Sequence, residues 1–129
     1  MIYLDTCIVI YWLEGEPEFR SSVLEAVRGE TGATFVISDL VRLECLVGPI
    51  RDGDAERRSR FEAQFRVLRR IALTKAVFDL AAELRALHRL RTPDALHAAC
   101  ALHHGCRAFW TNDRRFSAIE DRLAMRVLP

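Results

Sequence analysis

Short apolar runs alternate with longer segments of helical periodicity along the whole chain, and this alternation restricts the possible folds more than any other feature of the sequence. We expect strands at about 1–4, 34–37, 71–73, 106–111 and 125–128. We expect helices at about 6–13, 17–28, 39–47, 52–68, 75–90, 93–104 and 113–120. Strands that alternate with helices predict an α/β layer fold with a mostly parallel central sheet.

Local residue patterns predict where several of these helices begin and end. Ser38 is a plausible N-cap, and Gly48-Pro49 predicts the end of the helix that Ser38 starts. Thr92, Pro93 and Asp94 form a strong helix start, with a threonine as N-cap, a proline at the first helical position and an acid in the first turn.

The size of the chain predicts a single domain over residues 1–129. With 129 residues, of which 50% are hydrophobic, it can bury one core but hardly two. Its four cysteines form no C-x-x-C pair, which favours free thiols in a reducing compartment. No secretory signal and no apolar stretch of about 18 to 20 residues is present, so we expect a cytoplasmic protein.

Net charge gives no argument for nucleic-acid binding, because the formal charge is only +1. All but one of the 19 basic residues are arginines, which suit bidentate phosphate contacts, although coding-genome base composition explains this equally well. One run of arginines is a candidate for steering phosphates, or is simply a solvated helix face. The run comprises Arg51, Arg57, Arg58, Arg60, Arg66, Arg69 and Arg70.

Four acidic residues stand where ligand sites of α/β folds usually lie, beyond the carboxyl ends of the strands. Asp5 ends the first predicted strand, Asp113 follows the strand that ends at residue 111, and Asp94 lies in the first turn of a helix. Glu44 is singled out by apolar neighbours at helical spacing, because a carboxylate on a core-facing stripe needs compensation.

Each of these acids also has a simpler interpretation. Asp94 could stabilise a helix dipole, Asp5 and Asp113 could cap helices, and Glu44 could pair with an arginine. The fold hypothesis, however, brings all four to one edge of the sheet, where carboxylates without a cation would repel one another. Carboxylate oxygens favour Mg²⁺ or Mn²⁺ over zinc, and phosphodiester hydrolysis by metal-activated water is the natural chemistry.

Four segments that contain these acids together resemble the PIN domain family, specifically the VapC-type toxins of bacterial toxin–antitoxin pairs. Each segment alone is a weak motif, but their order and spacing over essentially the whole chain are specific. They are Tyr3-Leu4-Asp5-Thr6, Arg42-Leu43-Glu44, Thr92-Pro93-Asp94-Ala95-Leu96-His97-Ala98-Ala99 and Thr111-Asn112-Asp113-Arg114-Arg115-Phe116.

The resemblance implies a three-layer α/β/α sandwich with a parallel sheet of four to five strands. It also implies a Mg²⁺- or Mn²⁺-dependent endoribonuclease that forms homodimers and is inhibited by a small cognate antitoxin. Asp5, Glu44, Asp94 and Asp113 match the family's metal-binding acids, and Thr6 and Thr111 match supporting hydroxyl positions. These motifs do not distinguish among transfer, ribosomal and messenger RNA targets.

Two other functions remain as alternatives. A binding module with the same fold would use its acidic pocket to receive a basic side chain from a partner, without catalysis. A Mg²⁺-dependent phosphatase is less well supported, because such enzymes place a second aspartate two residues after the first, where this chain has Cys7. His97 stands three residues after Asp94 and is either a partner of the metal-binding acids or a polar residue packed beside them.

Overall fold

Five short parallel strands form the centre of the fold, in the spatial order β3-β2-β1-β4-β5. The computed structural model describes residues 1–129. The strands are β1 (Ile2–Leu4), β2 (Phe35–Ile37), β3 (Arg69–Arg70), β4 (Ala108–Thr111) and β5 (Met125–Val127). The predicted parallel sheet of four to five strands is therefore confirmed.

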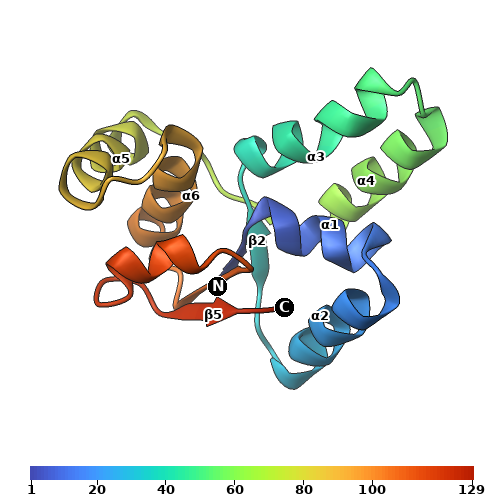
Figure 1. Ribbon diagram of the computed structural model, residues 1–129, viewed down its shortest axis with the longest axis horizontal. Helices are drawn as coiled ribbons and strands as arrows, with labels where there is room; N and C mark the ends of the chain where they lie inside the picture. The colour runs from blue at the N-terminus through green and yellow to red at the C-terminus, as the bar shows by residue number, and fades with distance from the viewer.

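Helices cover both faces of this sheet. They are α1 (Thr6–Glu14), α2 (Pro17–Gly29), α3 (Asp39–Arg51), α4 (Ala55–Val67), α5 (Lys75–His88), α6 (Thr92–His103) and the 3₁₀ helix η1 (Arg114–Ile119). Figure 1 shows α5 and α6 on one side of the sheet and α1 and α2 on the other, with α3 and α4 extending as a pair. The three-layer α/β/α sandwich is confirmed. None of the helices is long and apolar enough to cross a membrane.

The central strands are apolar at consecutive positions because both of their faces are buried. Ile2, Tyr3 and Leu4 of β1 have no exposed surface, and Phe109 and Trp110 of β4 are almost as fully buried. A parallel sheet that is covered by helices on both sides is expected to show such continuous runs, without the alternation of a half-exposed strand.

The predicted end of the third helix at Gly48-Pro49 is wrong. Helix α3 continues through Pro49 to Arg51, and Gly53, with a φ of 63°, follows its end. A proline normally disfavours helical geometry in the preceding residue by contact with its Cβ, and Gly48 has no Cβ. The helix therefore loses one hydrogen-bond donor at Pro49 and continues.

Two further boundaries differ from the prediction. Helix α4 begins at Ala55 and not near residue 52, because the left-handed Gly53 separates it from α3 and Asp54 caps it by accepting from Arg57 N. The third strand consists of Arg69 and Arg70 and not of residues 71–73, since these arginines pair with β2 at the sheet edge. The apolar signal that suggested the later position comes from Ile71, a core residue.

The start of α6 is displaced by one residue. Arg91 occupies the N-cap position, and Thr92 is the first helical residue. The Thr92 hydroxyl does not cap the helix but accepts a hydrogen bond from Arg85 Nη1 at 2.5 Å. Thr74 caps α5 by accepting from Val77 N, and Asp113 caps η1 by accepting from Arg115 N. Pro93 and Asp94 lie in the first turn of α6, as predicted.

The topology brings the ends of three strands to one edge of the sheet. Strand β1 lies between β2 and β4. The chain continues from β1 to β2 and β3 on one side of β1, and β4 and β5 lie on its other side. Ligands of open α/β sheets bind at such a reversal of strand order, beyond the carboxyl ends of the strands. Asp5, Ser38 and the Thr111–Asp113 segment all follow or end these three strands.

Candidate active site

Asp5 is a buried carboxylate held by both of its oxygens. It directly follows β1 and is only 9% exposed. Its Oδ1 accepts a hydrogen bond from Thr6 N at 2.8 Å, which caps α1, and its Oδ2 accepts one from Thr111 Oγ1 at 2.6 Å. The predicted capping role is therefore present, and the second contact links Asp5 to the end of β4.

Asp113 is joined to Asp5 through Thr111. The backbone N–H of Asp113 donates to Thr111 Oγ1 at 3.0 Å, while the same hydroxyl donates to Asp5. Thr111 is completely buried, so this bridge is shielded from water. It holds the ends of the neighbouring strands β1 and β4 in a fixed relation.

Glu44 reaches the same region from α3. Its Oε1 accepts hydrogen bonds from Thr6 Oγ1 at 2.9 Å and from His97 Nε2 at 2.5 Å. His97 Nε2 also lies 3.8 Å from Asp5 Oδ1, so one buried histidine stands between two carboxylates. The expectation that Glu44 lies on a core-facing stripe is only partly right, because Val41 is buried whereas Val47 is 51% exposed.

These contacts keep Glu44 ionised. Burial raises the pKa of its carboxyl group, but the hydrogen bond and the charge of His97, followed by the hydrogen bond from Thr6, lower it by more. The net result is a pKa below the ordinary value of glutamic acid. A carboxylate in this state accepts hydrogen bonds and binds cations.

A buried chain of hydrogen bonds leads from His97 to Tyr3 and on to Ser38. His97 Nδ1 lies 2.8 Å from the Tyr3 hydroxyl, which lies 2.8 Å from Ser38 Oγ. Because the Glu44 carboxylate only accepts, His97 Nε2 carries the proton that it donates. The opposite ring nitrogen, Nδ1, is joined through the Tyr3 hydroxyl to Ser38, so the ring is held at both of its nitrogens.

Sequence reasoning missed this chain of Ser38, Tyr3 and His97. Ser38 was expected to cap α3, but its side chain makes no capping hydrogen bond and turns to Tyr3 instead. A signal was present in the sequence: Tyr3 is the polar exception within an apolar strand, and Ser38 directly follows the neighbouring strand. His97 is 2% exposed and contacts the acids directly.

Asp94 and Asp113 each face an arginine. Arg91 Nε donates to Asp94 Oδ2 at 3.1 Å, and Arg115 makes a forked contact with both oxygens of Asp113. Hydrogen bonding from Arg115 lowers the pKa of Asp113 more than burial raises it. Both arginine side chains are more than half exposed, at 65% and 58%. The carboxylates themselves are only 14% and 19% exposed, so a cation that binds them would compete with these solvent-facing arginines.

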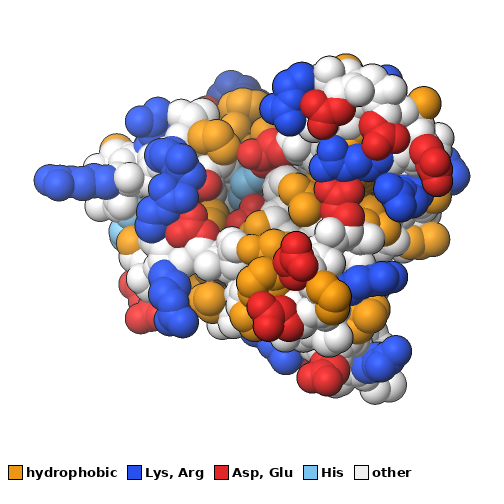
Figure 2. All heavy atoms as spheres, turned by 45° about the vertical axis from the view of Figure 1, so that its right-hand side comes forward, with side chains coloured by type: hydrophobic (Ala, Val, Ile, Leu, Met, Phe, Trp, Pro, Cys, Tyr) orange, Lys and Arg blue, Asp and Glu red, His pale blue; other side chains and the backbone are white.

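The four predicted acids share one region, but they do not form a closed group of metal ligands. No three side chains of His, Cys, Asp or Glu lie close enough together to hold a metal ion directly. The donor set nevertheless suits a hard cation, because Glu44 makes its hydrogen bonds through Oε1 alone and Asp94 makes its ion pair through Oδ2. The second oxygen of each is available. Figure 2 shows a hollow where acidic side chains surround a histidine and arginines form the border.

The cysteine beside these acids is not a nucleophile. Burial and the neighbouring charge of Asp5 raise the pKa of the Cys7 thiol to about 12, so it stays protonated near neutral pH. All four cysteines are free thiols, as predicted. The carboxylates are therefore the candidate reactive groups of this region.

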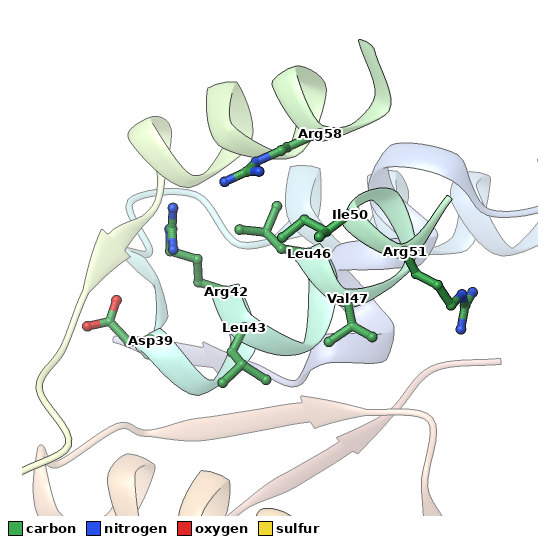
Figure 3. Close-up of a pocket in the computed structure, with 8 residues that line it drawn as sticks. All are labelled: Asp39, Arg42, Leu43, Leu46, Val47, Ile50, Arg51 and Arg58. Atoms are coloured by element: carbon green, nitrogen blue, oxygen red, sulfur yellow. The ribbon is translucent and has the colours of Figure 1, made fainter. Parts of the chain in front are cut away.

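A separate apolar groove lies on the outer side of α3 and α4. It has a volume of about 570 Å³, and Leu43, Leu46, Val47 and Ile50 form its apolar part. Figure 3 shows Asp39 and Arg51 at opposite ends of α3, with Arg58 above the apolar side chains and Arg42 beside Leu46. Because one carboxylate stands among three arginines, this groove is suited to binding an apolar surface and not to holding a cation.

Comparison with known proteins identifies the family. A family model described as the PIN domain matches residues 2–122, which include Asp5, Glu44, Asp94 and Asp113. The chain belongs to the PIN domain family. The resemblance inferred from the sequence motifs is thereby confirmed.

Solved structures share the fold of this PIN domain. VapBC2 from Rickettsia felis, bound to a DNA fragment from its promoter, aligns with a TM-score of 0.80, 24% identity and full coverage of both chains. A toxin–antitoxin complex from Klebsiella pneumoniae aligns with a TM-score of 0.77, 21% identity and 92% coverage of each chain. VapC20 from Mycobacterium tuberculosis, a toxin that cleaves the sarcin-ricin loop, aligns at 0.74 with 18% identity, covering 92% of this chain and 94% of that one. A search of curated protein sequences gave no match.

Proposed function

We propose that this PIN domain is a divalent-metal-dependent endoribonuclease that acts as the toxin of a type II toxin–antitoxin pair in the cytoplasm. One observation carries the proposal: Asp5 and Glu44, from separate elements, meet on either side of the buried His97. Purely structural acids would not need to converge. The fold shared with toxin structures, one of which cleaves an RNA loop, adds support.

Asp5, Glu44, Asp94 and Asp113 are the residues that would hold Mg²⁺ or Mn²⁺. Such an ion supplies an activated water near neutral pH and neutralises charge that develops on the phosphate. Asp5 is the most rigid of the four, because both of its oxygens are already fixed by Thr6 and Thr111. Glu44 is oriented by His97 and Thr6, so Thr6 and Thr111 are the supporting hydroxyls of this arrangement.

The remaining side chains around the acids prepare the site for an anionic substrate. His97, Tyr3 and Ser38 remove the freedom of Glu44 to rotate, and Thr111 joins the Asp5 and Asp113 segments. Preorganised groups of this kind need little rearrangement during a reaction.

Removal of divalent metal is expected to stop RNA cleavage completely, because carboxylates alone cannot offset the charge of a phosphodiester. The measurement is cleavage of labelled RNA by the purified protein, first after dialysis against EDTA and then after addition of Mg²⁺ or Mn²⁺. We expect no cleavage in EDTA and full recovery with either ion. Cleavage that persists in EDTA would contradict the metal requirement.

We propose that a cognate antitoxin inhibits the site by inserting a basic side chain among the acids. Arg91 and Arg115 already place guanidinium groups on Asp94 and Asp113, which supports the view that these carboxylates accept arginine. An inserted cation would compete with metal. Calorimetric titration with Mn²⁺ is therefore expected to show weaker metal binding in the antitoxin complex, and unchanged affinity would argue against this mode of inhibition.

We also propose that a second copy of the chain covers the groove on α3 and α4. Leu43, Val47 and Ile50 are each more than half exposed, which is unusual for three large aliphatic side chains on one helix face. Asp39 and Arg51 stand at the two ends of the helix. A two-fold antiparallel pairing would bring Asp39 of one copy to Arg51 of the other, so the surface is complementary to itself.

The substitution Val47→Glu is expected to convert a dimer to a monomer, because it introduces charge into the centre of this apolar surface. Light scattering after size-exclusion chromatography measures the mass. Phe78→Glu is the matched control, since Phe78 of α5 is equally exposed but lies outside the groove. A wild-type monomer, or a Val47→Glu dimer, would be the opposite result.

A further inference from the structure

A second cavity borders the acids and is rich in arginine. It has a volume of about 260 Å³ and is formed by the turn between α5 and α6, the first turn of α6 and the segment after β4. Its lining residues are His88, Arg89, Leu90, Arg91, Asp94 and Arg115. Three guanidinium groups thus face one carboxylate, which makes this cavity a candidate for an anion next to the candidate active site.

We propose that this cavity binds a backbone phosphate of the RNA strand, adjacent to the phosphate that is cleaved. The proposal rests on the nuclease function proposed above and assigns a substrate subsite to it. Asp94 belongs to both regions, and His97, one turn further along α6, contacts Glu44. A phosphate in the cavity would therefore lie beside the carboxylates while the arginines offset its charge.

Arg89 is the most informative residue of this cavity. It has a φ of 57°, and no other residue apart from glycine has a positive φ in this chain. It occupies the C-cap position of α5, where a left-handed residue is usually glycine because a Cβ is disfavoured there. Arg89 makes no ion pair, so its side chain is free to bind an anion in the cavity.

The turn that presents these arginines is held in place. Arg85 Nε donates to the carbonyl oxygen of Leu90 at 3.1 Å, and Arg85 Nη1 donates to the hydroxyl of Thr92. Leu90 itself is buried in the core. Arg89 and Arg91 flank this anchored leucine, so their backbones are fixed while their side chains remain exposed.

The two other arginines use only part of their hydrogen-bonding capacity on the acids. Arg91 and Arg115 pair with Asp94 and Asp113, and both side chains are largely exposed to solvent. Arg91 donates to Asp94 through Nε alone, and Arg115 donates to Asp113 through Nε and Nη2. Each guanidinium group therefore keeps free donors that can bind phosphate oxygens without a metal ion. The arginine run on α3, α4 and β3 is a weaker candidate for this contact, because none of its members lines the cavity beside Asp94.

The test is binding of a short fluorescein-labelled single-stranded RNA, followed by anisotropy in EDTA so that metal-dependent cleavage cannot interfere. We expect Arg89→Gly and Arg91→Gln each to raise the Kd about tenfold and to reduce the slope of log Kd against log salt by about 0.7, the loss of one phosphate contact. Arg89→Gly should at the same time keep or raise the thermal midpoint, because glycine relieves the left-handed backbone.

Arg20→Gln is the matched control, because Arg20 is an exposed arginine of α2 that makes no ion pair. Its Kd and salt slope should equal those of the wild type. The subsite is refuted if Arg89→Gly and Arg91→Gln bind RNA like the wild type, or if the wild type binds no RNA in EDTA. Parallel cleavage assays of the wild type with Mn²⁺ separate the two proposals, since a failed subsite leaves cleavage intact and a failed nuclease proposal does not.

Discussion

The substitution Asp5→Asn is expected to lower RNA cleavage at least about 100-fold while leaving the fold intact. Asp5 is the most deeply buried of the four acids and the one whose two oxygens are both held by neighbouring elements. Removing its charge removes the best-fixed anchor for a cation. A loss of several kcal/mol of charge stabilisation corresponds to about two or more orders of magnitude in rate.

The hydrogen bonds of Asp5 explain why asparagine should be tolerated structurally. The amide oxygen can still accept from Thr6 N, which preserves the cap of α1. The amide nitrogen would face Thr111 Oγ1, a hydroxyl that can accept as well as donate. That hydrogen bond is thus reversed, and the Thr111 hydroxyl proton is left with Cys7 Sγ, 3.8 Å away, as a weak acceptor. We therefore expect the thermal midpoint to fall by only about a few degrees.

The measurements for Asp5→Asn are cleavage of labelled RNA with Mn²⁺, thermal unfolding, and growth of a bacterial host that expresses the protein. We expect wild-type expression to arrest growth and Asp5→Asn to relieve the arrest. Asp79→Asn is the control, because Asp79 is an exposed aspartate of α5 whose ion-pair partner, Lys75, lies one turn away on the same helix. Wild-type cleavage by Asp5→Asn would remove Asp5 from the set of ligands, whereas an inactive wild type would refute the nuclease proposal itself.

The layers of the fold could be predicted because buried strands and half-buried helices have characteristic spacings of apolar residues. The runs that became β1 and β4 are apolar at consecutive positions, and the ends of parallel strands must meet at one edge. Asp5 and Asp113 could be placed at that edge for this reason alone. The predictions were wrong where a neighbouring residue offset a local signal. Pro49 signalled the end of α3, but the helix continues because the preceding residue is Gly48.

The partners of the acids could not be predicted in the same way. Which arginine meets Asp94 or Asp113 depends on side-chain rotation at the surface, and many arginines were available. The position of Glu44 was inferred from apolar neighbours, yet Leu43 and Val47 of the same helix are exposed. Glu44 lies at the border between core and groove, where helical periodicity gives no clear answer.

His97 contacts Glu44, Asp5 and Tyr3, which come from different parts of the chain. Replacing it should show whether His97 orients the Glu44 carboxylate or only fills space in the core. His97→Leu fills similar space but removes the hydrogen bond to Glu44, a side chain that is one-third exposed and otherwise held only by Thr6. Partners that orient metal ligands typically contribute about 10- to 100-fold to metal affinity or activity. We expect losses of that size in Mn²⁺ affinity and in cleavage.

Two companion variants decide what His97 contributes. His97→Gln can place an amide nitrogen near the former Nε2 and donate to Glu44, so it should restore much of the Mn²⁺ affinity that His97→Leu loses. Tyr3→Phe leaves the Glu44 contact in place but removes the hydroxyl between Ser38 and His97 Nδ1. It should reduce the free energy of unfolding by about 1–3 kcal/mol, because two buried polar groups lose a partner. Calorimetric titration with Mn²⁺ and chemical denaturation measure the two effects. If His97→Leu and His97→Gln both bind Mn²⁺ like the wild type, His97 is a packing residue and Glu44 is oriented by Thr6 alone.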